Sequence, residues 1–298
     1  MPSSETPAQI TPKSAWRLGG LSLWQLARRV LHSIAVHNFF GRASELAFDF
    51  LFALFPLLLF MLTLIGLFTS RSAELQGDLL AFFSDFLPST AFALLNTTAA
   101  ELASHVSNGK LTLGILLALL FASGGVSSMI SALNLAYGAK EERSWLRVRA
   151  IALCLTLLIS ILILAALLLV LVSGHAADWL GMRLGLTPEV VELWKALKWP
   201  AAIVFVILSH ALIYYFGPHL KNRRWHWITP GSVFGVLLWL AASLGLRMYL
   251  HFFNTYSATY GSLGAVMILL VWLYVTGFAF LVGGEINAAI ERAIARSA

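Results

Sequence analysis

A glutamate and an aspartate lie near the start of an apolar run, "ASELAFDFLFALFPLLLF", that covers residues 43–60. A helix would place Glu45 and Asp49 on one face, with Arg42 one turn before Glu45. Pro56 continues that face and frees the backbone carbonyl four residues earlier. Because a carboxylate that faces lipid is costly, we expect this stripe to face the protein interior or a water-filled cavity. The alternative is that both acids lie at the lipid headgroup level and pair with a nearby arginine.

Further polar side chains interrupt the other apolar runs and are candidates for a substrate or ion pathway. Arg247 either reaches the outer lipid headgroups or faces an outer vestibule together with Tyr260. Asn134, Glu285 and Asn287 lie at the expected cytoplasmic ends of their runs, and Asn134 requires a polar partner there. We therefore expect polar groups from several helices to meet at the cytoplasmic mouth.

Small residues indicate where helices could bend or approach closely. Gly124 and Gly125 lie in "FASGGVSSM", and Gly261 and Gly264 lie in "YGSLGAV". Close packing is the simpler interpretation, and a hinge beside a cavity is the alternative. His210 is a candidate proton carrier by its chemistry, although an intramembrane histidine more often hydrogen-bonds its neighbours.

The elements that must position these residues follow from composition. The chain has 298 residues, of which 59% are hydrophobic and only 11% are charged, so it has too few charges to cover a water-facing surface. Most of its apolar runs reach or approach the roughly 20 residues that span a bilayer core. We predict an all-α integral membrane protein with six transmembrane helices. The predicted spans are residues 44–68, 111–137, 150–172, 200–217, 230–250 and 263–284.

The distribution of lysine and arginine predicts the orientation. Most of them precede the first span, lie in the second-to-third and fourth-to-fifth connections, or follow the last span. Both termini are therefore expected in the cytoplasm. Residues 1–20 are predicted to be a disordered cytoplasmic tail, and residues 21–298 a single membrane domain. The net charge of +6 then reflects topology and contact with anionic lipids, and predicts no nucleic-acid partner.

The segments outside the spans also carry helical patterns. "LSLWQLARRVLHSIAVHNFF" separates apolar from basic residues, which is typical of an amphipathic helix in the cytoplasmic interface. A helix packed beneath the bundle is the alternative. The outer connections 69–110 and 173–198 are expected to form periplasmic helices.

Signatures of soluble enzymes are absent from the sequence. It contains no HExxH, CxxC, GxSxG or P-loop motif, and its eight histidines have no metal-ligand spacing. We therefore predict no enzyme activity, no metal and no cofactor. The single cysteine, Cys154, lies within the third span and is expected to be an apolar filler.

Several segments together resemble one family. "ISALNLAYGAKEERSWLRVRAIAL", "YYFGPHLKNRRWHWITPGSVFGVLLW" and the ending "YGSLGAV" through "GGEINAAIER" are similar, in order and spacing, to the YihY/virulence factor BrkB family. The resemblance covers about residues 20–295 and implies a bacterial inner-membrane protein with six spans and cytoplasmic termini. Glu45, Tyr260 and Glu285 match the family pattern, whereas Asp49 departs from it. Some members were once labelled ribonuclease BN, a misassignment.

Three functions remain open at this point. The first is a transporter or flippase-like protein that moves a lipid, another amphiphile or a small solute through a cavity between spans one, two, five and six. The second is a membrane scaffold or envelope-assembly factor, in which the polar groups only fix helix packing. A ribonuclease is the least supported, because the sequence offers few acids for a metal site. Membrane lipids are the expected partners, and a homo-oligomer is an open alternative.

Overall fold

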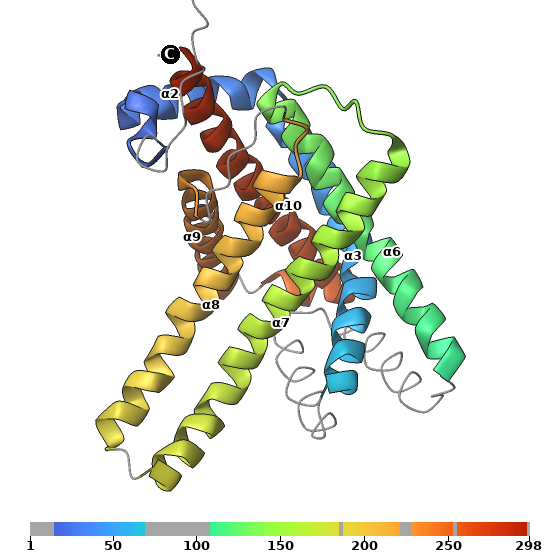
Figure 1. The fold of residues 1–298 in the computed structure, drawn as a ribbon, viewed down its shortest axis with the longest axis vertical. Coiled ribbons are helices and arrows are strands. Elements are labelled where there is room, and N and C mark those ends of the chain that lie inside the picture. Colours follow the sequence, from blue (N-terminus) through green and yellow to red (C-terminus); the bar gives the residue numbers. More distant parts are fainter. Residues whose placement is uncertain (1–14, 69–107, 185–186, 221–227, 253–254, 297–298) are drawn as a thin grey trace, which may run out of the picture.

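The computed structural model describes residues 15–68, 108–184, 187–220, 228–252 and 255–296. This part of the chain contains helices and no strands, which confirms the predicted all-α class (Figure 1). A short 3-10 helix precedes seven α-helices. The elements are η1 (Leu18–Gly20), α2 (Leu23–Val36), α3 (Phe39–Phe68), α6 (Asn108–Tyr137), α7 (Trp145–Leu184), α8 (Pro188–Phe216), α9 (Pro230–Phe252) and α10 (Thr255–Arg296).

Five helices in the described part of the chain are long and apolar enough to cross a membrane. They are α6, α7, α8, α9 and α10. The predicted first span falls in α3, which is not one of the five, so the count of six stays a prediction. The predicted outer connection 173–198 is largely the continuation of α7 and α8, whereas the tail 1–14 and residues 69–107 lie outside the described residues.

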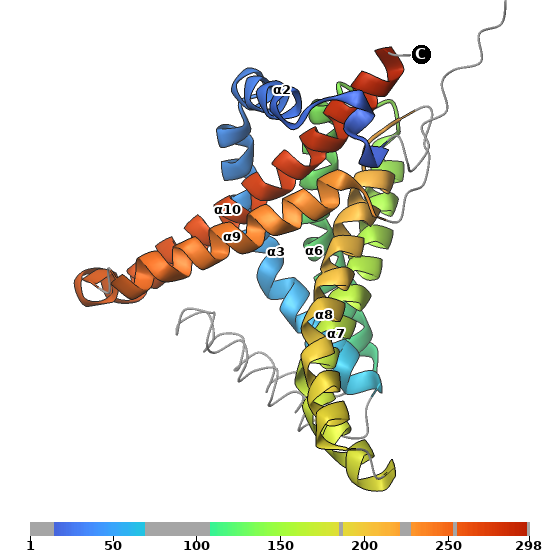
Figure 2. The ribbon, with the colours of Figure 1, turned by 90° about the vertical axis from the view of Figure 1, so that its left-hand side faces the viewer.

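Helix α10 organises the bundle. It contacts α9, α3, α6, α2 and η1, while α7 and α8 form a long antiparallel pair beside α6. Figure 2 shows the α9–α10 pair diverging from the α7–α8 pair, with the two pairs close together only near α2 and the C-terminus. We call that end of the bundle the α2 end. The α6–α7 connection lies at the α2 end, and the α7–α8 connection lies at the opposite end (Figure 1).

The core lies where α3, α6, α8 and α10 meet. Ala43 and Leu46 of α3 are fully buried against Leu133 of α6 and Phe280 of α10. Tyr214 of α8 donates a hydrogen bond from its hydroxyl to the Phe280 carbonyl, at 2.7 Å. Close van der Waals packing of this kind is what holds helices together where lipid replaces water. One face of α3 is therefore committed to the core.

Helix α2 lies across the end of the bundle that is named after it (Figures 1 and 2). Ser22 caps it and forms a reciprocal capping box with Gln25. Leu26 and Val30 are buried against the last turns of α10. One face of α2 is therefore packed against the bundle. Trp24, by contrast, is 76% exposed. The exposed apolar face of α2 that carries Trp24 is predicted to lie in a membrane interface, and this stays a prediction.

Glycines bring the start of α9 against α10. A methyl group at Gly231 would collide with the carbonyl oxygen of Gly283, and one at Gly283 would collide with the Tyr214 hydroxyl. Gly235 lies one turn along α9, also against Gly283. Small residues one turn apart allow the two backbones to approach closely. At Gly245, in the same helix, a methyl group would meet no atom within 4 Å.

Alanine substitutions in α9 test this crossing. Gly231→Ala should destabilise the purified protein by about 1 to 3 kcal/mol, because overpacking forces the two backbones apart. Gly245→Ala is the matched control and should be neutral or slightly stabilising, since alanine favours a helix over glycine. Thermal unfolding in detergent measures both. Equal stability of the two variants would contradict the close crossing.

Candidate functional site

The predicted site residues do not converge on one place. The structure distributes them over the exposed face of α3, a network at the α6–α7 connection, and two clusters on α10. The surroundings of these groups differ, and so does the chemistry that each group allows.

The polar stripe of α3 lies outside the core. Arg42 donates a hydrogen bond to Glu45 at 2.8 Å, and the two side chains are 41% and 63% exposed. Asp49 is half-buried, and Phe52 is 65% exposed on the same side of the helix. The predicted pairing of Glu45 with Arg42 is therefore present. The described part of the bundle leaves Arg42 and Glu45 largely open and covers Asp49 in part.

Helix α3 continues without interruption through Pro56, whose side chain is half-buried. On the neighbouring helix, Gly125 lies against Ala53 of α3, where a methyl group would be 3.3 Å from the alanine Cβ. Gly125 thus lets α3 and α6 pack closely at this point. A methyl group at Gly124 would meet no atom within 4 Å, and α6 runs unbroken through both glycines.

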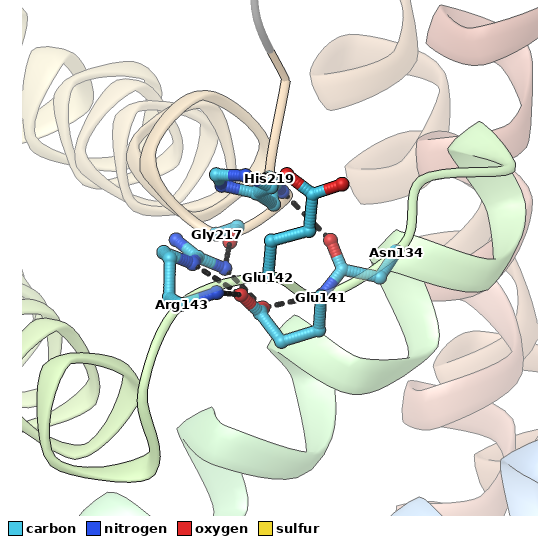
Figure 3. A network of polar contacts seen from close by, with 6 residues as sticks. All are labelled: Asn134, Glu141, Glu142, Arg143, Gly217 and His219. Carbon is cyan, nitrogen blue, oxygen red and sulfur yellow. Dashed lines mark hydrogen bonds and ion pairs between the residues drawn. The ribbon is translucent and has the colours of Figure 1, made fainter.

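A polar network joins α6, the α6–α7 connection and the end of α8 (Figure 3). Asn134 donates from Nδ2 to Glu141 Oε2 at 2.8 Å and accepts at Oδ1 from the His219 backbone N–H at 2.7 Å. Arg143 donates to both oxygens of Glu141, at 2.7 and 2.5 Å. It also donates to the Gly217 carbonyl at 2.8 Å. Asn134 thus has its required partners. The amide nitrogen and the amide oxygen of its side chain each form a hydrogen bond within the protein.

The charges of this network stabilise each other. The two hydrogen bonds from the Arg143 guanidinium, helped by its backbone N–H and by Asn134, lower the pKa of Glu141 to about 2. Arg143 is buried, so its charge depends on that carboxylate and on the Gly217 carbonyl. Gly138, at a positive φ of 64°, ends α6 and lets the chain turn toward Glu141.

Glu285 is the most deeply buried acid in the described part of the chain, with no exposed surface. Its Oε1 forms an ion pair with Arg292, two turns later on α10. Arg292 also donates to the Ala136 carbonyl at 2.9 Å, which fixes the end of α6 to α10. The other oxygen, Oε2, lies 3.8 Å from Nδ1 of His37. This group connects α10 with the corner between α2 and α3.

Asn287 has a packing role. Its Oδ1 accepts from the Gly231 backbone N–H at 2.8 Å, and its Nδ2 donates to the Thr229 hydroxyl at 2.9 Å. Thr229 and Ser232 also exchange hydrogen bonds across the first turn of α9. Asn287 therefore satisfies the Gly231 N–H, one of the backbone donors in the first turn of α9 that have no partner within the helix.

The other candidates are separate from these groups. Arg247 is exposed on α9, and Gly264 is buried in α10. Tyr260 and Gly261 belong to α10, but their side-chain positions lie outside the described residues. His210 forms a hydrogen bond with the Val206 carbonyl of its own helix at 3.0 Å. A hydrogen bond to a neighbour was the alternative to its role as a proton carrier.

Sequence reasoning missed three residues of these clusters: Glu141, His37 and Arg292. Glu285 and Arg292 are seven residues apart on one helix, a spacing that places them on the same face and could have been noticed. Nothing in the sequence pairs His37 with Glu285, which are far apart in the chain. Within the described residues, no group of three or more His, Cys, Asp or Glu side chains is arranged to hold a metal ion.

The chain is thus an apolar helical bundle of membrane-protein type, with buried ion pairs gathered at one end. A sequence model of the family described as Virulence factor BrkB matches residues 30–298, so the chain belongs to this family. The predicted family is confirmed, and with it a membrane protein.

Curated relatives match over most of their length. A Bacillus subtilis relative, YfkH, whose name describes it as ribonuclease-like, is 31% identical over 257 residues, 86% of this chain and 92% of its own. A UPF0761 membrane protein of Coxiella burnetii is 29% identical over 84% of this chain and 87% of its own. Another, from Pseudoalteromonas atlantica, is 25% identical over 84% and 80%. No solved structure matches the chain.

The Glu141 network predicts a dependence of stability on pH. Because the folded pKa of about 2 lies below the ordinary 4.5, the carboxylate stabilises the fold above pH 4.5, and this contribution is lost as the pH falls toward 2. Glu141→Gln should therefore cost about 1 kcal/mol at pH 7, allowing for solvent screening of a partly exposed pair. The difference from the parent should shrink below pH 4.5 in thermal unfolding.

Glu142→Gln is the matched control for this experiment. The Glu142 side chain is 64% exposed and lies 3.9 Å from His219, so its removal should change stability little at any pH. Equal losses in the two variants would show that the network contributes no specific stability.

Proposed function

We propose that this protein is a bacterial inner-membrane transporter or flippase-like protein that moves a lipid, another amphiphile or a small solute along the exposed face of α3. Both termini, and hence the α2 end, lie in the cytoplasm. The residues that we assign to the pathway are Arg42, Glu45 and Asp49, with Pro56 further along the same helix.

The polar stripe of α3 is the observation that carries this proposal. Arg42 and Glu45 are exposed and Asp49 is half-buried, on a helix whose opposite face packs into the core. Direct contact with acyl chains would be unfavourable for these charges. Water or the polar part of a transported molecule is a better environment. The exposed charges therefore favour a hydrated pathway beside α3.

The neighbouring side chains favour an amphiphile. Phe48 and Phe52 are 59% and 65% exposed, and their rings lie 4.7 Å apart beside the polar stripe. A polar headgroup could pair with Arg42 or Asp49 while its apolar chain lies over the two phenylalanines. The stripe and the ring pair thus match the two halves of such a molecule.

A scaffold without transport is the second candidate, and the other polar clusters favour it. Asn134, Arg143 and Asn287 all bond within the protein and fix helices to each other. A ribonuclease, as the name of the Bacillus subtilis relative describes, is not favoured. Two of the buried or partly buried acids that it would need, Glu141 and Glu285, are already paired with arginines.

Substitutions in the stripe test transport. Asp49→Asn keeps the shape of the side chain and removes its charge, so expression and thermal stability should remain near the parent while flux falls several-fold. Fluorescent phospholipids and labelled solutes in reconstituted vesicles provide the measurement. Glu142→Gln removes the charge of an exposed acid outside α3 and is the matched control. Unchanged flux in Asp49→Asn and Glu45→Gln, with an active parent, would remove the stripe from the pathway.

Reporter fusions test the orientation. Fusions after Arg149 and after Arg224 should report the cytoplasm, because positively charged connections stay inside. Fusions near Gln76 and Asp178 should report the periplasm. A cytoplasmic signal at Asp178 would overturn the six-span arrangement and the assignment of the α2 end to the cytoplasm.

A further inference from the structure

We propose that His37 and Glu285 form a proton-binding site that fastens the corner between α2 and α3 to α10. The site goes beyond the proposed transport, since its ligand is a proton and its effect is on the contact between helices. If the protein does transport, proton uptake there would bias the position of the helix that carries the α3 stripe.

Two buried polar atoms that lack hydrogen-bond partners define the site. His37 Nδ1 and Glu285 Oε2 are both enclosed, and neither has a hydrogen-bond partner among the described residues. They lie 3.8 Å apart, too far for a hydrogen bond and close enough for one after a small movement. An unsatisfied buried acceptor is costly, so a proton shared between them has a clear benefit.

The backbone holds His37 in this position. His37 caps the end of α2, where its N–H donates to the Ser33 carbonyl at 2.8 Å. Asn38 then adopts a positive φ of 48° and turns the chain into α3. The ring of His37 stacks on Phe39, which is fully buried in the core. Because the corner is tight, any change in the attraction between His37 and Glu285 acts directly on α2 and α3.

Charged and titratable groups from three helices surround Glu285. Tyr137 of α6 interacts electrostatically with Glu285, Glu291 and Arg292 of α10 and with Tyr214 of α8, so these groups form one cluster. Tyrosine side chains are neutral at physiological pH. Within the cluster, Glu285 and Arg292 carry opposite charges and pair with each other through Oε1. A proton on His37 would give the second carboxylate oxygen, Oε2, a positively charged donor.

The proton has a defined origin and destination. The His37 side chain is 27% exposed, so its ring can take a proton from water. Protonated imidazole carries N–H groups on both nitrogens, so Nδ1 can then donate to Glu285 Oε2. Glu285 Oε1 stays paired with Arg292 throughout. Neutral imidazole offers no charge to the carboxylate, and the contact loosens when the proton leaves.

Hydrogen–deuterium exchange of residues 22–40, in detergent or nanodiscs without substrate, tests this site. After correction for the intrinsic effect of pH, exchange in the parent should be about threefold slower, or more, at about pH 5.5 than at pH 8. His37→Gln and Glu285→Gln should abolish this difference. His32→Gln, an exposed histidine on the same helix, should keep it.

The outcomes separate the proton site from the proposed transport. The proton site would be overturned if the parent showed no pH difference in exchange, or if the difference persisted in His37→Gln. The result for His37→Gln decides the question even if Glu285→Gln fails to fold. Because the measurement contains no substrate, a pH response lost in His37→Gln supports the site even if α3 variants leave flux unchanged. Conversely, loss of flux in Asp49→Asn says nothing about His37.

Discussion

The need to satisfy polar groups inside an apolar bundle governs the α2 end of this protein. Where lipid replaces water, each buried donor, acceptor or charge must find its partner in the protein. Arg143 finds Glu141 and the Gly217 carbonyl, and Arg292 finds Glu285 and the Ala136 carbonyl. Each of these arginines joins segments distant in the chain, so pairing of charges and positioning of helices are achieved by the same contacts.

Small residues make that arrangement geometrically feasible. Gly231 and Gly283 let the start of α9 approach α10 so closely that Asn287 can accept a hydrogen bond from the Gly231 backbone N–H. Gly125 likewise lets α6 approach α3 closely. In the absence of a hydrophobic driving force between helices, such contact supplies the packing energy. The clusters therefore depend on the close crossings as much as the crossings depend on the polar bonds.

The fold class could be predicted because a helix that crosses a bilayer needs a long run of apolar residues, and such runs are visible in the sequence. The family could be predicted from motifs around the connections between helices. The partners of individual side chains could not. Asn134 was expected to need a partner, but Glu141 and His219 reach it only because α6 and α8 end side by side. Glu285 was expected at the cytoplasmic mouth, at the same membrane level as Glu45. However, α10 crosses α3 with Gly277 against Leu46. Glu285 follows Gly277 by eight residues, and the rise of a helix therefore places it about 12 Å beyond this crossing, toward the α2 end.

The contrast between the clusters and the α3 stripe bears on function. A side chain whose polar atoms all bond within the protein has no capacity left for a ligand, and Asn134 and Asn287 approach that condition. Asp49 has no ion-pair partner among the described residues, and Glu285 keeps one oxygen without a hydrogen bond. These two acids differ in access: Asp49 is half-buried beside the exposed pair Arg42 and Glu45, whereas Glu285 is enclosed and can accept little more than a proton. Binding and coupling would then occupy different helices, connected through the corner at His37.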